Sequence, residues 1–161
     1  WKVIETLGHA QSHLSFYRES DGVMIAGDHI LVHISPNPII EPPFEGGTER
    51  TKPLLQYNDS LKKLMNIPIS YAYTGHGKEV DDVHALIPKR LAKQEERAGS
   101  VLGMLQGKQQ TVFDICKRLF PSVYQKELGL TLSETIGQLD YLESIGSIRK
   151  EKQNNVYYYY A

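Results

Sequence analysis

The alternation of apolar and polar residues predicts strands at the start of the chain. Residues 2–6 and 14–18 have the composition of strands, and the second run alternates with a period of two. Asp21-Gly22 then separates it from the β-prone run 23–28. Asp-Gly between two such runs is a strong hairpin signal, so we expect residues 14–18 and 23–28 to pair as antiparallel strands.

A proline-rich loop and two helices are predicted in the middle of the chain. Residues 35–50 contain four prolines and two adjacent glycines, a pattern typical of a long surface loop of the kind that borders functional sites. Pro53 can begin a helix that runs to about residue 65. Its expected buried stripe is Leu54, Leu55, Leu61 and Leu64. A short strand over 69–73 and a long helix over about 79–105 follow.

The last third of the chain has a different pattern, with shorter helices and a hairpin. Thr111 is a suitable N-cap for a helix over 112–120, and Thr131 for a second helix that Gly146 ends. Polar residues 153–155 separate two further β-prone runs, 148–152 and 156–160. Helix, turn, helix and hairpin together predict a winged-helix-like unit.

Composition is that of an ordinary globular protein. The 161 residues are 40% hydrophobic and 23% charged, with a formal net charge of −1, so no overall attraction to nucleic acid or to an anionic membrane is expected. No apolar run reaches the roughly 18 residues of a membrane span, and the first residues lack a signal-peptide pattern. We therefore expect a cytoplasmic protein without a membrane partner. The single cysteine, Cys116, excludes an internal disulfide and is expected to be buried and inert.

Three polar residues follow strand-like runs, and each is preceded by glycine: His9, Asp28 and His76. Glycine lets the backbone turn sharply at a strand end. Imidazole nitrogen and carboxylate oxygen are ligands for zinc, iron or manganese, and a carboxylate can bridge two cations because it has two oxygens. From spacing alone, an ordinary surface or core residue is the favoured interpretation of each histidine.

Around these positions the chain resembles the metallo-β-lactamase superfamily. Gly8-His9 with His13, Gly27-Asp28-His29 and Gly75-His76-Gly77 are similar, in order and context, to three successive signatures of that superfamily. The resemblance extends over nearly the whole chain. It implies an α/β fold in which residues 1–105 form the second half of an αββα sandwich and residues 106–161 form a winged-helix-like α+β domain.

The resemblance also implies roles for individual residues. His9 would be the third histidine on a first metal, Asp28 the bridging carboxylate, and His76 a terminal ligand of a second metal. His13 would support the ligands or be structural, and His29 would support the ligands or have an uncertain role. In the intact enzyme the family implies a pair of metals, usually zinc, that activate a water for hydrolysis.

Two departures from the family pattern limit what this chain is expected to do. A Leu7-Gly8-His9-Ala10-Gln11-Ser12-His13 run stands where the family has a Pro-Gly-His-Thr-Pro-Gly-His-like run. The leading His-x-His-x-Asp-His signature is absent, and with it the remaining ligands and the aspartate that orients the attacking water. Asp81-Asp82-Val83-His84 is only superficially similar to that signature, and its acidic residues are expected to complement a helix N-terminus. We therefore expect the C-terminal part of a metal-dependent hydrolase that binds zinc weakly or not at all, has no identifiable catalytic residue and is inactive alone.

A nucleic-acid-binding module on a noncatalytic scaffold is the alternative function. Residues 100–161 carry seven basic and six acidic side chains, too small an excess for a sequence-specific DNA-binding domain. The predicted hairpin nevertheless contains Arg149, Lys150 and Lys152 beside four tyrosines, which could contact RNA or a single strand. The substrate of the parent would be a small molecule or RNA. A sheet that lacks its first half should expose an edge and apolar surface, which predicts a homodimer, strand exchange or aggregation.

Overall fold

The computed structural model describes residues 1–43 and 46–161, which divide into two units, Trp1–Ala92 and Lys93–Ala161. We call them the N-terminal unit and the C-terminal unit. The sequence placed the boundary after residue 105, at the end of helix α2 (Val83–Leu105), whereas the two units divide within that helix. The second half of α2 therefore belongs with the tail.

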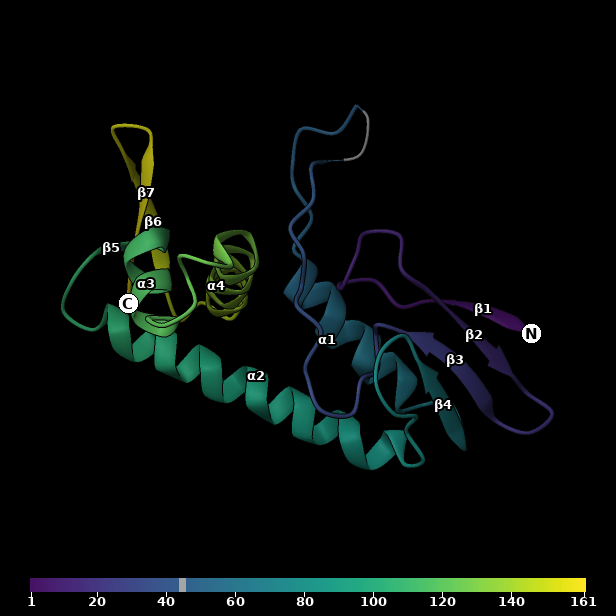
Figure 1. The fold of residues 1–161 in the computed structure, drawn as a ribbon. Helices are drawn as coiled ribbons and strands as arrows, with labels where there is room; N and C mark the ends of the chain where they lie inside the picture. Colours follow the sequence, from purple (N-terminus) through teal and green to yellow (C-terminus); the bar gives the residue numbers. More distant parts are fainter. Residues whose placement is uncertain (44–45) are drawn as a thin grey trace. The chain divides into compact units, whose positions relative to one another are not determined.

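A four-stranded sheet forms the N-terminal unit together with helix α1, which lies beside it (Figure 1). Its order is β1-β2-β3-β4, where the strands are β1 (Lys2–Glu5), β2 (Leu14–Arg18), β3 (Val23–Gly27) and β4 (Tyr71–Thr74). The β2–β3 pair is antiparallel with Phe16 opposite Ile25, so the predicted hairpin is confirmed. β1 is antiparallel to β2, and β4 is parallel to β3.

The period of two gives this sheet one buried and one open face. Tyr17, Met24, Ala26 and Ala72 are buried on the first face. Helix α1 (Pro53–Leu64) begins at Pro53 as predicted, and its buried apolar residues are Pro53, Leu54, Tyr57, Leu61 and Leu64. The predicted stripe was wrong at Leu55, which is only partly buried, and Tyr57 is a buried residue that the prediction did not include.

The opposite face of the sheet carries a row of exposed apolar side chains. Val3 pairs with Phe16, Phe16 with Ile25, and Ile25 with Tyr73, so all four lie on the same side of adjacent strands. Their exposed fractions are 60%, 40%, 44% and 49%. We call this row the open face. The expectation that the sheet exposes apolar surface is confirmed.

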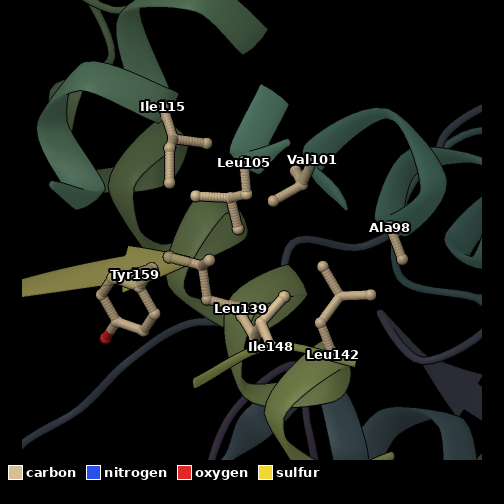
Figure 2. Close-up of a cluster of buried hydrophobic side chains, with 8 residues drawn as sticks. All are labelled: Ala98, Val101, Leu105, Ile115, Leu139, Leu142, Ile148 and Tyr159. Atoms are coloured by element: carbon tan, nitrogen blue, oxygen red, sulfur yellow. The ribbon is translucent and has the colours of Figure 1, made fainter. Parts of the chain in front are cut away.

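The C-terminal unit contains the end of α2, two further helices and a three-stranded antiparallel sheet. These elements are β5 (Gln110–Thr111), α3 (Val112–Leu119), α4 (Leu128–Ser144), β6 (Arg149–Gln153) and β7 (Val156–Tyr160), with sheet order β5-β7-β6. Figure 2 shows the buried cluster that joins them: Ala98, Val101, Leu105, Ile115, Leu139, Leu142, Ile148 and Tyr159. Cys116 is buried, as expected.

The ends of these helices can be compared with the caps predicted from the sequence. Thr111 caps α3, since its side chain accepts a hydrogen bond from the backbone N–H of Asp114. The second predicted cap was wrong: α4 begins at Leu128, and the Thr131 hydroxyl instead donates to the Glu127 carbonyl inside the first turn. Gly146 follows the helix end with a φ of 71°. The helices and hairpin of the winged-helix-like prediction are present, and assignment to that class stays a prediction.

Two other element boundaries differ from the sequence expectation. β4 begins at Tyr71 rather than residue 69, and α2 begins at Val83 rather than residue 79. No regular element forms in the described residues of the predicted loop 35–50, of which 44 and 45 lie outside the description. Within the described chain, no helix combines the length and apolarity needed to cross a bilayer.

Candidate metal centre

The three predicted ligands lie together at one edge of the four-stranded sheet. β1, β3 and β4 run in the same direction, because β1 and β3 both oppose β2 and β4 is parallel to β3. Their C-terminal ends therefore meet at the same edge. His9, Asp28 and His76 follow these three ends, so strand direction brings residues far apart in sequence to one place.

Asp28 lies between the two histidines. Its Oδ2 is 3.5 Å from His9 Nε2, and its Oδ1 is 3.4 Å from His76 Nε2. The Asp28 side chain is 28% exposed and that of His9 22%, whereas that of His76 is 73% exposed. Each oxygen of one carboxylate thus faces a different imidazole.

Glycine at position 75 makes room for this carboxylate. A Cβ atom built on Gly75 would collide with Asp28 Oδ1, the oxygen that faces His76. Gly75 also donates its backbone N–H to the Gly27 carbonyl at 2.8 Å, which ties the end of β4 to the end of β3. The glycine before His76 is therefore needed for close approach of the two strand ends as well as for the turn that the sequence indicated.

His13 is oriented by a chain of hydroxyl groups. Ser15 Oγ donates to the Ala26 carbonyl at 3.3 Å, so its own oxygen accepts from Thr6 Oγ1 at 2.7 Å. Thr6 Oγ1 in turn accepts from His13 Nδ1 at 2.8 Å, which leaves the lone pair of the neutral ring on Nε2. The His13 ring lies 6.2 Å from that of His9. Burial, followed by the neighbouring His9, lowers the pKa of His13, so the neutral form is favoured.

His29 differs from the other histidines of the site because it is fully buried. Its ring packs edge-on against Tyr57 with centroids 4.9 Å apart, and neither ring nitrogen has a hydrogen-bond partner within residues 1–43 and 46–161. Burial lowers the pKa of His29 to about 3, so the ring is neutral. The side chain therefore belongs to the core beside the site.

The arrangement does not enclose a single ion. No group of three or more His, Cys, Asp or Glu side chains in residues 1–43 and 46–161 is arranged to hold one metal ion. His9 and His76 instead face separate oxygens of Asp28. Each of two positions is therefore offered one imidazole nitrogen and one carboxylate oxygen. Asp82 acts elsewhere: its Oδ1 accepts the backbone N–H of Ala85 at 2.8 Å at the start of α2, as expected for an acid at a helix N-terminus.

Sequence reasoning predicted the loop over 35–50 but not its contacts with the His9 segment. Asn37 contributes its backbone carbonyl, which lies 3.0 Å from His9 Nδ1. Glu41 accepts the backbone N–H of Gln11 at 2.5 Å. The only available signal was the cluster of prolines at 36–43, which indicated a loop near a site but not its partner.

The basic residues of the predicted hairpin lie on β6, all of whose residues are exposed. Lys150 and Lys152 both approach the ring of Tyr157, with Nζ 5.6 and 5.8 Å from the centroid. Lys150 also forms an ion pair with Glu143 at 2.9 Å, and this hydrogen bond raises the pKa of Lys150. Arg149 lies on the same exposed strand.

Comparisons with known proteins agree with this geometry. Residues 1–76 match the family model of the metallo-β-lactamase superfamily. A relative named "Probable metallo-hydrolase YqjP" from Bacillus subtilis is 43% identical over 159 residues, which are 99% of this chain and 50% of the relative.

Solved structures show the same fold over both units. A metallo-β-lactamase family protein from Thermus thermophilus matches 99% of this chain and 49% of its own, with a TM-score of 0.81 and 29% identity. A β-lactamase domain protein from Burkholderia ambifaria matches 100% of this chain and 48% of its own, with a TM-score of 0.84 and 26% identity. The chain thus spans about half the length of these relatives. Residues 1–76, which carry the His9–Asp28–His76 cluster, form a domain of the metallo-β-lactamase superfamily.

Proposed function

We propose that this chain contributes one part of a two-metal hydrolytic site, with His9, Asp28 and His76 as ligands and Asp28 as the bridge. One observation carries the proposal: the two oxygens of Asp28 face the Nε2 atoms of two different histidines, at 3.5 and 3.4 Å. A bridging carboxylate needs this divergence, because each of its oxygens must serve a different cation.

The chemistry of the donors supports a metal at this place. Asp28 Oδ1 is buried and accepts no hydrogen bond from the described residues, which is costly for a carboxylate oxygen in the absence of a cation. Neutral imidazole nitrogens and a carboxylate form a donor set suited to zinc. The exposed His76 ring can adjust its position, since no fixed partner is seen for its ring beyond Asp28 in the described contacts.

Metal ions at such a site lower the pKa of a bound water and polarise the bond under attack. The residues of this chain would hold and orient such ions. His9 and Asp28 are partly buried and fixed by the strand ends, whereas His76 reaches in from solvent. No residue identified in the described chain can be assigned as the general base.

We further propose that the whole protein completes the site from outside these residues and that this chain alone does not turn over substrate. The chain covers about half of its relatives, and it supplies only two imidazoles and one carboxylate to the cluster. Three donors shared between two positions should bind zinc weakly, because structural and catalytic zinc sites have three or four protein ligands for each ion.

Zinc titration of matched variants tests the ligand assignment. By calorimetry we expect the unchanged chain to bind zinc and Asp28→Asn to bind at least about ten-fold more weakly, because the amide loses the negative charge and one acceptor oxygen. His84→Gln, which removes an imidazole outside the cluster, is the control and should leave affinity unchanged. Equal affinity in Asp28→Asn and the unchanged chain would refute the proposed bridge.

A second candidate function is contact with single-stranded RNA through the β6–β7 hairpin. The approach of Lys150 and Lys152 to the exposed Tyr157 ring favours it, since an exposed aromatic ring can stack on a base while nearby cations meet phosphates. The Lys150–Glu143 pair limits the free charge, so we expect weak, salt-dependent binding.

Fluorescence anisotropy with a labelled single-stranded RNA tests this candidate. We expect Tyr157→Ala and Lys152→Ala each to weaken binding, whereas Lys108→Ala, a cation outside the hairpin, should not. If all three variants bind the RNA with the affinity of the unchanged chain, the hairpin is not the contact.

A further inference from the structure

His9 is held by a loop whose shape is set by two prolines. We infer that the Pro36-Asn37-Pro38 segment fixes the tautomer of the His9 ring, so that the Nε2 lone pair faces Asp28 before any ion binds. The inference rests on the proposed metal site for its functional meaning. The tautomer itself can be measured without metal.

His9 contacts a backbone carbonyl through its Nδ1 atom. His9 Nδ1 lies 3.0 Å from the backbone carbonyl oxygen of Asn37. A carbonyl oxygen only accepts hydrogen bonds, so Nδ1 must carry the proton in this contact. In the neutral ring the lone pair then lies on Nε2, the atom 3.5 Å from Asp28 Oδ2.

The Asn37 carbonyl lies in a conformationally restricted segment. Pro36 and Pro38 are both buried, on either side of the partly exposed Asn37. Proline fixes its own φ, and the residue before a proline is restricted to extended conformations. Asn37 precedes Pro38, so its carbonyl has little freedom to turn away from the ring. A main-chain acceptor held in this way orients an imidazole more firmly than a flexible side chain would.

Three further hydrogen bonds attach the loop to the His9 segment. Ile39 donates its backbone N–H to the His9 carbonyl at 3.2 Å, and Gln11 donates its own to Glu41 Oε2 at 2.5 Å. The Gln11 side chain also donates to the Pro42 carbonyl at 2.7 Å. The Glu41 bond is charge-assisted and therefore the strongest of the three. Glu41 is thus a positioning residue that acts on His9 through the loop.

Without these restraints the ring could adopt the other tautomer. Its Nε2 would then carry hydrogen and present no lone pair to a cation between His9 and Asp28. Partners that orient a metal-binding imidazole typically change metal affinity by about 10-fold to 100-fold when removed. We therefore expect loss of the restraint to weaken zinc binding without removing any ligand.

The tautomer is tested in the zinc-free chain by ¹⁵N NMR of labelled histidine rings, at a pH where the His9 ring is neutral. We expect the Nδ1–H tautomer to predominate in the unchanged chain and in Asn37→Ala, which keeps the main-chain carbonyl. Glu41→Gln and Pro38→Ala should each raise the population of the Nε2–H tautomer. Glu49→Gln, which alters an exposed carboxylate of the same loop, is the matched control. The inference is overturned if Glu41→Gln and Pro38→Ala both leave the tautomer unchanged, or if Asn37→Ala shifts it as much as they do.

Calorimetry with zinc separates this inference from the proposed function. Glu41→Gln and Pro38→Ala should bind zinc about ten-fold more weakly than the unchanged chain. Asn37→Ala and Glu49→Gln should bind zinc with nearly the affinity of the unchanged chain. Glu41→Gln is nearly isosteric and serves as the decisive variant if Pro38→Ala does not fold. If the unchanged chain binds no zinc, the proposed metal site fails, whereas the NMR result still decides whether the loop sets the tautomer. Equal zinc affinity in all variants, despite a shifted tautomer, would overturn the functional part of the inference.

Discussion

Gly75 and Asp28 approach each other so closely that a side chain at position 75 would occupy the place of Asp28 Oδ1. The two residues come from the ends of β4 and β3, which are joined by the hydrogen bond from Gly75 N–H to the Gly27 carbonyl. The position of the carboxylate therefore depends on the absence of a Cβ atom on the neighbouring strand.

Gly75→Ala should displace the Asp28 carboxylate and weaken zinc binding. We expect zinc affinity to fall by at least about ten-fold, because a wrongly oriented ligand reduces metal affinity about as much as the loss of a contact that orients it. Calorimetry gives the affinity, and thermal unfolding shows that the variant is folded. Gly103→Ala is the control, since a Cβ there meets no atom within 4 Å and alanine favours the helix. Unchanged zinc affinity in Gly75→Ala would show that Asp28 is not held by this contact.

The open face should make the isolated chain self-associate. Val3, Phe16, Ile25 and Tyr73 form a row across the whole sheet, and β1 is an edge strand, so both the face and the edge are open to a second copy. We expect light scattering to show dimers or larger species. Phe16→Thr with Ile25→Thr should shift the population toward monomer.

Val123→Thr is the matched control, since Val123 is 44% exposed in the C-terminal unit. A chain that is monomeric at all concentrations, or a Val123→Thr variant that dissociates as fully as the double variant, would contradict association through this sheet.

The ion pair between Arg97 and Glu134 should contribute more to stability than surface pairs do. Arg97 Nη1 lies 2.6 Å from Glu134 Oε1, and the Glu134 side chain is 4% exposed. Arg97→Ala leaves this carboxylate buried without its cation, while Gln138 still donates to the same oxygen at 3.0 Å. Breaking a buried pair costs about 3 to 5 kcal/mol, and the 37% exposure of Arg97 places the expected loss toward the lower limit.

Lys2→Ala provides the comparison. Lys2 pairs with Glu19 at 2.5 Å, but both side chains are more than 60% exposed, so its loss should cost less than about 1 kcal/mol. Urea unfolding of both variants measures the difference. Similar losses in the two variants would show that burial of Glu134 adds nothing to the pair.

Local patterns in the sequence predicted most elements of this fold. The alternation in residues 14–18 identified β2, and Asp21-Gly22 identified the hairpin. Thr111 was correctly identified as a cap, whereas Thr131 was not, because the same residue type can donate to a carbonyl within a helix. Whether a threonine caps a helix or lies in its first turn depends on the residue at which the helix begins. A short sequence pattern around the threonine does not identify that residue.

The candidate site shows the same limit. The three glycine-preceded residues were found because strand ends carry a recognisable pattern, and the structure brings them together. The contacts of Asn37 and Glu41 were not found, since a backbone carbonyl has no sequence signature and pairing between two loops follows no period. Contacts that join irregular segments over long separations are thus the part that the sequence leaves open.

The turn between β6 and β7 has a consequence for the order of folding. Asn154 and Asn155 both have positive φ, 49° and 64°, as a two-residue hairpin of matching twist requires. The register of that hairpin is therefore set by adjacent residues, and such hairpins form in about 1 to 10 μs. The parallel pairing of Val23 with Tyr71 must instead close a long intervening segment first. The edge that carries Asp28 and His76 is consequently expected to be among the last parts of the molecule to assemble.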